Sequence, residues 1–293
     1  MPSSRRNRRV KQDPDNHLKK AVNLREFYPS RSNNVRKGDF GRVVICGGSD
    51  RYAGCLAFNA LAALRAGADL AVVVAPRRAA DIVAGYSPDL ITVPCDSPFP
   101  DPDVAIELLE NADSMVMGCG VTRTPESHRA LLDIIQRCEA PMVLDAEALH
   151  ALAASPDTIK GKQAVLTPNA GEYQVLSESP WPESVDGKRI AVQTLAKQYK
   201  ATVIVKGAID FISNGEKVYL DTAGSVYMTK GGYGDLLAGV AGAHLARGRN
   251  PFDAAKVSAF IVGKAGELAG AWFGESVLAS DVLSHIDLVI RSR

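Results

Sequence analysis

The sequence predicts an α/β protein whose mostly parallel β-sheet is covered by helices on both faces. Two observations carry this prediction: short β-branched segments alternate with longer segments of helical periodicity, and the alternation repeats along most of the chain. Strands separated by helices form βαβ units, which pair their strands in parallel and place the helices over the sheet. With 293 residues and 46% hydrophobic content, the chain is long and apolar enough for one large domain.

The expected elements follow one another in a regular order. The strands are expected within residues 42–48, 70–76, 114–120, 141–146, 163–168 and 201–207. The helices between them are expected within residues 54–67, 126–138 and 188–199, where apolar residues recur at helical spacing. Two prolines and a glycine mark residues 178–187 as a loop that interrupts a helical region.

The alternation ends after Gly207. Residues 210–215 and 216–221 are expected to form a hairpin around the turn residues Asn214 and Gly215, with a further strand at 225–228. Only helices follow, at residues 236–247 and 253–271, and then a short one opened by Ser280 and Asp281.

The charges are unevenly distributed along the chain. Residues 1–41 carry eleven Lys/Arg and four acids, a net +7, so that a total of +1 leaves the remaining chain at +1 − 7 = −6. A basic head of this kind is typical either of nucleic-acid contact or of a solvated extension. No aromatic residues interleave with the first basic cluster, which favours the extension. We therefore expect a basic, flexible extension over residues 1–35, a single domain over 36–293, and no nucleic-acid partner.

The composition also indicates the compartment. Five cysteines are scattered without a C-x-x-C pair, which is typical of a protein from a reducing cytoplasm. The chain has no apolar run of about 18 residues and no apolar core near its N-terminus, so we expect no membrane span and no secretory signal. The five histidines show no metal-ligand spacing, and we expect no zinc site.

The strongest chemical signal is residues 229–239, TKGGYGDLLAG. Gly231, Gly232 and Gly234 allow backbone N–H groups to converge on one point, and the helix that follows adds its unpaired N–H groups and positive dipole end. Such a place binds phosphate, and Asp235 beside it is positioned to accept a proton from an attacking hydroxyl. A glycine-rich turn capped by an aspartate is the alternative interpretation.

Residues 230–239 resemble the Gly-Asp anion-hole motif of the ribokinase-like superfamily. Within it, six segments in order resemble the ADP/ATP-dependent NAD(P)H-hydrate dehydratases: residues 36–70, 118–120 (GCG), 143–149 (VLDAEAL), 166–173 (LTPNAGEY), 203–212 (VIVKGAIDFI) and 230–239. The resemblance covers residue 36 to the C-terminus. It implies a ribokinase-like three-layer sandwich and a lyase that uses ADP or ATP with Mg²⁺. Such an enzyme phosphorylates the ring hydroxyl of NAD(P)H hydrate and eliminates phosphate, which restores NADH or NADPH.

The resemblance also implies residue roles. Asp235 would be the catalytic base in contact with the hydrated ring, and Glu172 would lie near Mg²⁺ and phosphate. The nucleotide would be held by Lys206, Gly207, Ala208, Ile209, Asp210, Gly231, Gly232 and Gly234. The hydrate would be held by Gly54, Cys55, Gly118, Gly120, Asn169 and Asp235. Lys206 as a strand-end surface lysine and Glu172 as an ordinary first-turn acid are the alternatives.

Three residues depart from the family pattern. Asn169 stands where most members have a histidine, and its amide cannot become cationic. Cys55 replaces an alanine, and Cys119 replaces the proline of the turn commonly written G-P-G. We expect Asn169 to affect how tightly the hydrate is bound, and Cys119 to make the turn less rigid than proline would.

Other functions share part of this pattern. A kinase for a vitamin precursor or sugar would use the same Asp235 and glycines with a different acceptor pocket. A non-catalytic nucleotide sensor would have no need of a base at Asp235. Asp145 and Glu147 are weaker candidates for orienting a ligand or metal, and a helix cap explains them equally well. The family resemblance further implies a homo-oligomer, with a tetramer favoured, and leaves ADP against ATP open.

Overall fold

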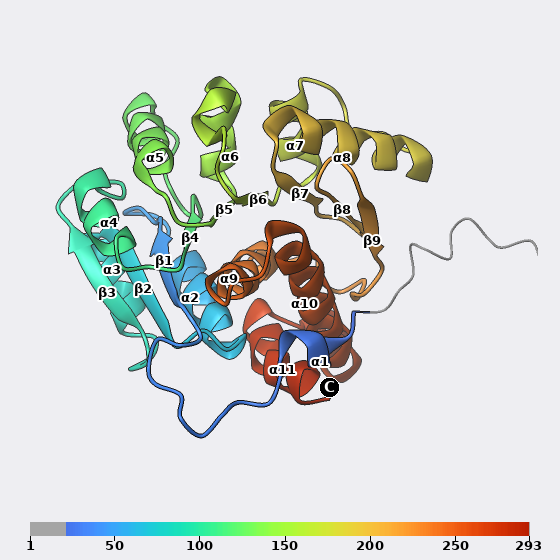
Figure 1. Ribbon diagram of the computed structural model, residues 1–293, viewed down its shortest axis with the longest axis horizontal. Helices are drawn as coiled ribbons and strands as arrows, with labels where there is room; N and C mark the ends of the chain where they lie inside the picture. Colours follow the sequence, from blue (N-terminus) through green and yellow to red (C-terminus); the bar gives the residue numbers. More distant parts are fainter. Residues whose placement is uncertain (1–21, 293) are drawn as a thin grey trace, which may run out of the picture.

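A nine-stranded β-sheet forms the middle layer of the protein, whose computed structural model describes residues 22–292 (Figure 1). The strand order is β3-β2-β1-β4-β5-β6-β7-β8-β9. Neighbouring strands from β3 to β7 pair in parallel, whereas β8 and β9 form an antiparallel hairpin at one edge. The chain thus first builds outward from β1 to β3 and then returns to β4 on the other side of β1. Open α/β sheets bind ligands at such a reversal.

The strands are short and mostly buried. Their bounds are Arg42–Cys46 (β1), Leu70–Pro76 (β2), Ile91–Cys95 (β3), Ser114–Met117 (β4), Met142–Leu144 (β5), Ala164–Leu166 (β6), Thr202–Val205 (β7), Asp210–Ser213 (β8) and Val218–Asp221 (β9). Alternate residues of a strand point to opposite faces, so Val43 and Ile45 belong to one apolar core and Val44 and Cys46 to the other. The sheet therefore separates two cores, as the predicted three-layer arrangement requires.

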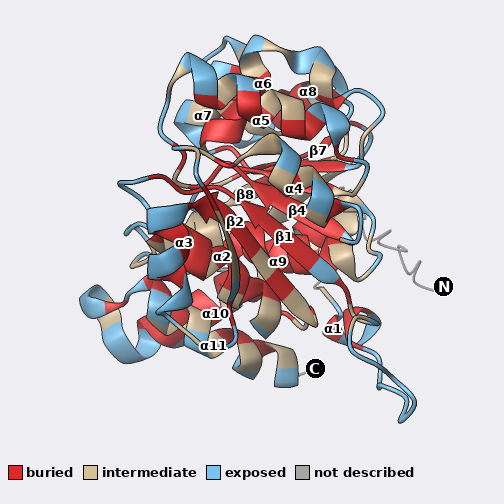
Figure 2. Cartoon of the chain, turned by 90° about the vertical axis from the view of Figure 1, so that its left-hand side faces the viewer, coloured by how far each residue is buried: buried red, intermediate tan, exposed pale blue. Residues whose placement is uncertain are grey.

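Helices cover both faces of the sheet, and the buried band between them is continuous (Figure 2). One face carries α2 (Gly54–Arg65), α3 (Arg77–Ala84), α9 (Tyr233–Ala246), α10 (Pro251–Phe273) and α11 (Ala279–Arg291). The other carries α4 (Pro102–Leu109), α5 (Pro125–Arg137), α6 (Glu147–Ala154), α7 (Ala170–Ser177) and α8 (Val185–Tyr199). Two 3₁₀ turns, Pro156–Ile159 and Gly274–Ser276, complete the set within the described residues. The predicted α/β class with helices on both faces is confirmed.

One predicted strand is wrong. Residues 225–228 form turns instead of a strand, because this segment packs onto α10 and not onto the sheet. Glycines of α10 make room for it: a Cβ at Gly266 would overlap the sulfur of Met228, and one at Gly270 would lie 2.6 Å from Oγ of Ser225. The last helix, α11, is also longer than the short one expected.

The N-terminal boundary of the packed body lies earlier than residue 36. Within the expected extension, the short helix α1 (Leu24–Phe27) buries Leu24 and Phe27, and Tyr28 is also buried. The Tyr28 hydroxyl lies 3.0 Å from Nε2 of His244 in α9, and the Arg247 guanidinium donates to the Phe27 carbonyl at 3.2 Å. The buried part of this segment, residues 24–28, thus docks against the end of α9, whereas residues 29–35 are exposed. The first basic cluster, residues 5–11, lies outside the described residues.

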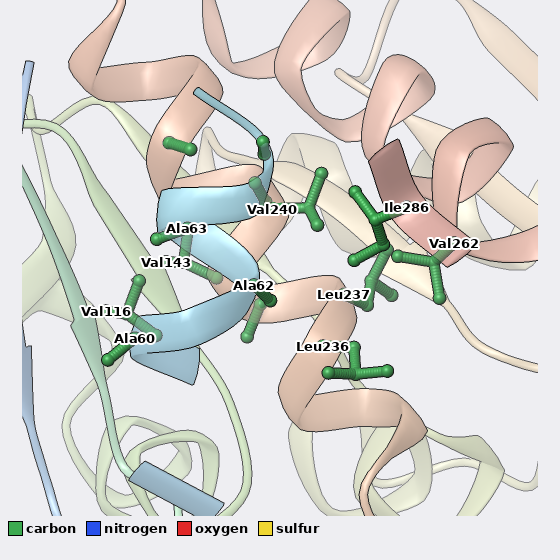
Figure 3. Close-up of a cluster of buried hydrophobic side chains, with 14 of the residues drawn as sticks. Ala60, Ala62, Ala63, Val116, Val143, Leu236, Leu237, Val240, Val262 and Ile286 are labelled. Atoms are coloured by element: carbon green, nitrogen blue, oxygen red, sulfur yellow. The ribbon is translucent and has the colours of Figure 1, made fainter. Parts of the chain in front are cut away.

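The position of α9 is fixed by close packing against α2. Asn59 Nδ2 of α2 donates to the Asp235 carbonyl at 2.8 Å, and a Cβ at Gly239 would overlap the Asn59 backbone. Figure 3 shows the apolar cluster to which both helices contribute: Ala60, Ala62 and Ala63 of α2 lie on one side of it, and Leu236 and Leu237 of α9 lie beside Val262 and Ile286. Small residues let the two helices approach closely, so the first turn of α9 has little freedom to move.

No helix within residues 22–292 combines the length and the apolar character that crossing a membrane would need.

Candidate active site

Neighbouring strands deliver polar side chains to one edge of the sheet. Cys119 follows β4, Asp145 follows β5, Thr167 follows β6 and Lys206 follows β7, and these four strands are consecutive in the sheet. Because parallel strands end at the same edge, the four side chains are brought together despite their separation in sequence.

Asp145 is the centre of this group. It is only 3% exposed, and its Oδ1 accepts from Nζ of Lys206 and from the Thr167 hydroxyl, each at 2.8 Å. Its Oδ2 faces the Cys119 thiol, whose sulfur lies 3.5 Å away. Burial lowers the pKa of Lys206, but the Asp145 and Glu172 carboxylates outweigh burial and raise the pKa above its usual value. Lys206 is therefore charged, and it is more than the strand-end surface lysine that was the alternative.

Asp235 lies in the first turn of α9, partly buried beside this group. Burial and the nearby Asp145 carboxylate raise the pKa of Asp235 to about 6, although Cys119 and Lys206 act in the opposite direction. A carboxyl group with such a pKa is ionised at neutral pH and accepts protons better than an ordinary aspartate. Its environment is therefore suited to general-base catalysis.

The helix start beside Asp235 is uncapped. The N-cap residue of α9 is Gly232, which has no side chain to bond the first N–H groups and adopts φ +105°. A Cβ there would lie 2.7 Å from Cβ of Ala279, so both backbone conformation and space require glycine. The N–H groups of this turn remain available for an anion, which the capped-turn alternative does not explain.

A cleft of about 850 Å³ opens next to this helix start. Its lining includes seven of the eight residues expected at the nucleotide, namely Lys206, Gly207, Ala208, Asp210, Gly231, Gly232 and Gly234. Ile209 does not line it and instead packs against the core on the α8 side. The Gly207 N–H donates to Oδ1 of Asp210 at 2.9 Å, and this bond closes the 207–210 turn. The two glycine-containing segments, far apart in sequence, thus face one cleft.

Among the residues expected at the hydrate, Asn169 lines this cleft and the others do not. Cys55 and Gly120 are in contact, since a Cβ on Gly120 would lie 2.5 Å from the Cys55 sulfur. Gly118 adopts φ +114°, and a Cβ there would overlap the Asp145 carbonyl, so this turn also requires glycine. Gly54 begins α2 beside Cys55. A second hollow, of about 370 Å³, is lined by Ser49, Asp50, Arg51, Pro98, Phe99, Thr122, Thr124 and Glu126, and none of the residues expected at the hydrate is among them.

Asn169 and Glu172 cap the start of α7, a structural role that fits their spacing of three residues. They form a capping box at the start of α7, with Asn169 Oδ1 accepting from the Glu172 N–H at 3.0 Å and Glu172 Oε2 accepting from the Asn169 N–H at 2.7 Å. Glu172 Oε2 also lies 3.9 Å from Nζ of Lys206. Asn169 lines the nucleotide-side cleft and not the second hollow. Both residues therefore border the site while capping a helix.

Two further residues belong to the site, and one weaker candidate does not. Asp145 holds Lys206, and the Thr167 hydroxyl in turn donates to Asp145. From the sequence, Asp145 was only a weaker candidate for orienting a ligand or metal, and Thr167 was given no role of its own. Their position directly after buried strands was the available signal. Glu147 instead pairs with Arg123 at 2.8 Å and with His128 at 2.5 Å, and it is not part of the contacts of Asp145, Thr167 and Lys206.

Comparison with solved structures identifies the class of fold. A ribokinase-like superfamily protein from Enterococcus faecalis superimposes with a TM-score of 0.79, covering 92% of this chain and 93% of that chain at 21% identity. The ADP/ATP-dependent NAD(P)H-hydrate dehydratase from Bacillus subtilis, co-crystallised with ATP/Mg²⁺, also gives a TM-score of 0.79, covering 92% and 95% at 21% identity. The fold is ribokinase-like.

Sequence comparison identifies the family. Residues 43–288 match the family model described as NAD(P)H-hydrate dehydratase, and the chain belongs to this family. The family predicted from the motifs is thereby confirmed.

Individual relatives are identical to the chain at about a third of the aligned positions. A bifunctional NAD(P)H-hydrate repair enzyme from Pyrobaculum aerophilum is 37% identical over 268 residues, 89% of this chain but 53% of the relative, so the chain spans about half the length of this bifunctional protein. An ADP-dependent (S)-NAD(P)H-hydrate dehydratase from Cenarchaeum symbiosum is 34% identical over 92% of this chain and 94% of its own. An ATP-dependent enzyme from Drosophila pseudoobscura is 32% identical over 97% and 96%.

Proposed function

We propose that the protein converts (S)-NAD(P)H hydrate back to NADH or NADPH at the expense of ADP or ATP. The observation that carries this proposal is the placement of Asp235, whose pKa is about 6, at the uncapped start of α9 between the nucleotide-side cleft and the turn of Gly118 and Gly120. Relatives that match most of the chain are named as dehydratases of this hydrate, one ADP-dependent and one ATP-dependent.

The first half-reaction is a phosphoryl transfer. The nucleotide lies in the cleft with its terminal phosphate against the N–H groups of residues 231–234, and the Asp235 carboxylate accepts the proton of the ring hydroxyl. The hydroxyl oxygen bonds to the terminal phosphorus while the bond from phosphorus to the nucleotide oxygen breaks. Lys206, held by Asp145, which also accepts from the Thr167 hydroxyl, supplies a fixed positive charge beside this transfer.

The second half-reaction is an elimination. Phosphate is a better leaving group than hydroxide, so the ring C–O bond breaks with the electron pair leaving on phosphate. A proton departs from the neighbouring ring carbon, and the ring regains its double bond. The sum of the two halves is loss of water from the hydrate and hydrolysis of one phosphoanhydride bond, without any oxidation.

Mg²⁺ is the metal that the family implies, and the chain offers an oxygen ligand that suits it. The Glu172 carboxylate is mostly covered, with a side chain 14% exposed, and lies beside Lys206 at the edge of the site. Burial raises the pKa of Glu172, so an incoming cation would stabilise its ionised form. Glu172 together with nucleotide phosphate oxygens would hold Mg²⁺, which neutralises charge on the transferring phosphate.

The test is direct turnover. The full chain is incubated with NADH hydrate, Mg²⁺ and either ADP or ATP, and the return of reduced-nicotinamide absorbance is followed. We expect turnover with at least one nucleotide, and parallel assays with NADPH hydrate give the cofactor preference. Consumption of nucleotide without release of phosphate or NADH would instead indicate a kinase of the same fold. No NADH with either nucleotide would refute the proposal.

The role of Asp235 is tested by the Asp235→Asn variant. The amide cannot accept the hydroxyl proton, so we expect turnover to fall by at least about 100-fold, the usual contribution of a general base. Nucleotide binding, followed by calorimetry, should be largely retained because the N–H groups of α9 are unchanged. Asp186→Asn is the matched control, since Asp186 is also a first-turn helix aspartate but is 90% exposed and far along the chain. Equal activity of the two variants would remove Asp235 from its role.

We also propose a homo-oligomer, with a tetramer expected from the family resemblance. Light scattering of the full chain tests it, and a monomer at assay concentrations would contradict it.

A further inference from the structure

A second chemical feature lies within the active site: a thiol and two carboxylates converge on one point. The Cys119 sulfur, a carboxylate oxygen of Asp145 and a carboxylate oxygen of Asp235 all lie within 4.8 Å of one another. They come from the loop after β4, the end of β5 and the first turn of α9. Within the described residues no other group of three such ligands is this compact. The phosphoryl transfer proposed above uses Asp235 but has no need of a thiol.

The spacing suits a small divalent cation. Tetrahedral sites with bonds of 2.0–2.3 Å place neighbouring ligand atoms about 3.3–3.8 Å apart. The observed upper limit of 4.8 Å is slightly wider, so a modest inward movement of side chains closes the geometry. Asp235 is partly exposed, which gives a cation a route in and leaves a fourth position for water.

The charges favour a cation that replaces the thiol proton. Lys206 occupies Oδ1 of Asp145 at 2.8 Å, which leaves Oδ2 turned toward Cys119 at 3.5 Å. A cation bound between the three groups would replace the thiol proton, stabilise the thiolate and relieve the repulsion between the two carboxylates.

The ligand chemistry selects the class of cation. A thiolate disfavours Mg²⁺, which prefers oxygen ligands only, and favours Zn²⁺, Cd²⁺ and Co²⁺. We infer that Cys119, Asp145 and Asp235 form a binding site for a thiophilic divalent cation, distinct from Mg²⁺, which blocks catalysis by occupying the carboxylate of Asp235. The inhibitory part of this inference rests on the function proposed above, whereas the binding site does not.

The binding site is tested with Co²⁺ as the probe. The full chain, without nucleotide or substrate, is titrated with Co²⁺ and followed by absorption. We expect one equivalent to produce the intense near-ultraviolet band of a thiolate–Co²⁺ bond, and Cys119→Ala to abolish it. Cys55→Ala is the matched control, since the Cys55 thiol lies beside Gly120, next to Cys119, but outside the three-ligand group, and it should retain the band.

A serine variant distinguishes loss of the sulfur ligand from loss of the folded structure. Cys119→Ser keeps the size of the side chain, so it should melt like the wild type and still lack the band, because the band requires sulfur. A wild-type spectrum without the band, or a band that survives in Cys119→Ser, would overturn the site.

Inhibition is tested in the same proteins. Zn²⁺ added to the Mg²⁺-supported dehydratase assay should inhibit the wild type and Cys55→Ala, and a chelator should restore activity. In Cys119→Ala at least tenfold more Zn²⁺ should be needed, each variant being compared with its own zinc-free rate. Equal sensitivity to Zn²⁺ would overturn the inhibitory role. If the chain had no dehydratase activity at all, the Co²⁺ spectrum would still decide whether the site exists, so failure of the two proposals can be told apart.

Discussion

Asp235 differs from an ordinary first-turn aspartate in the direction of its pKa shift. The positive end of a helix dipole normally stabilises the ionised carboxylate and lowers its pKa. Here burial and the neighbouring Asp145 carboxylate dominate, and the pKa rises to about 6. The residue is thus ionised at neutral pH while staying close to the pKa at which a base is most effective.

The pH dependence of turnover follows from this pKa. Because only the ionised form of Asp235 accepts a proton, kcat/KM should be level above about pH 7 and fall roughly tenfold per unit below about pH 6. Lys206 lowers the pKa of Asp235, so Lys206→Met should move the inflection to higher pH. Steady-state rates from pH 5 to 9 for both proteins provide the measurement. An inflection that moves to lower pH in Lys206→Met would contradict the electrostatic account.

At the level of single residues, the sequence predicted the site residues that stand close together in one short motif. Asp235 and the glycines beside it stand in one short motif, and the structure places them at a helix start where the glycines line a cleft. The pairing of Asp145 with Lys206 joins residues 61 positions apart, so it depends on which strands are neighbours. Strand order cannot be read from periodicity, and therefore Asp145 could not be ranked above Glu147.

At the scale of the elements, two glycines in the turn that begins α9 differ in whether the fold itself requires glycine. Gly232 is needed by the fold, since it has φ +105° and a Cβ would lie 2.9 Å from Cε2 of Phe58. Gly231 has open space around it, with nothing within 4 Å of an added Cβ. Any requirement for glycine at 231 must therefore come from a ligand that approaches the backbone.

This contrast gives a prediction for two variants. Gly232→Ala should destabilise the protein by more than about 1 kcal/mol, because alanine does not fit that backbone conformation. Gly231→Ala should melt like the wild type but bind nucleotide about tenfold more weakly, a loss of about 1.4 kcal/mol. Thermal melts and calorimetric titration measure the two effects. Wild-type nucleotide affinity in Gly231→Ala would argue against phosphate contact at this turn.

The segment before β1 is an element of the fold in its own right. Leu24, Phe27 and Tyr28 are buried, and the Tyr28 hydroxyl is hydrogen-bonded to a His244 ring that is 0% exposed. Burial, together with Arg247 and Arg249, lowers the pKa of His244 to about 3, so its ring is neutral under this cover. The basic composition of residues 1–41 obscured these apolar anchors, which explains why the predicted boundary fell too late.

Two truncations test this element. Removing residues 1–21 should change the stability little. Removing residues 1–35 should lower the free energy of unfolding by at least about 3 kcal/mol, the usual cost of losing one buried aromatic side chain. Denaturant unfolding of both truncated proteins is the measurement. If the longer deletion is as stable as the shorter one, residues 22–35 contribute no packing energy.

The other differences between expectation and structure also lie in particular elements. The outer strand β3 was not predicted because Pro94 interrupts its pattern, and proline is tolerated there since β3 lies at the edge of the sheet. Residues 225–228 have strand-like composition but pack onto a helix. The central strands were predicted well because burial on both faces makes them short, continuous apolar runs.

At the scale of the whole molecule, one sheet carries both the candidate active site and a pair of acidic residues on which the stability of the fold depends. The strands that carry Asp145 and Lys206 lie between two apolar cores, and the hairpin of β8 and β9 extends the same sheet to its edge. At that edge Asp210 and Asp221 stand directly opposite each other. Asp221 is 4% exposed, and its Oδ2 has no hydrogen-bond partner among the described residues. Burial and the Asp210 carboxylate raise the pKa of Asp221 to about 7.

This pair makes the stability of the fold depend on pH. Above pH 4 the unfolded chain has already lost the Asp221 proton, while the folded protein keeps it until about pH 7. The free energy of unfolding therefore falls as pH rises through this window. Asp221→Asn keeps the shape and removes the ionisation, so the variant should gain about 2 kcal/mol over the wild type at pH 8 relative to pH 5. Urea unfolding at the two pH values measures this difference, and Asp186→Asn, at an exposed position, should show none. A stability difference between Asp221→Asn and the wild type that is the same at both pH values would mean that Asp221 ionises as easily in the folded protein as in the unfolded chain.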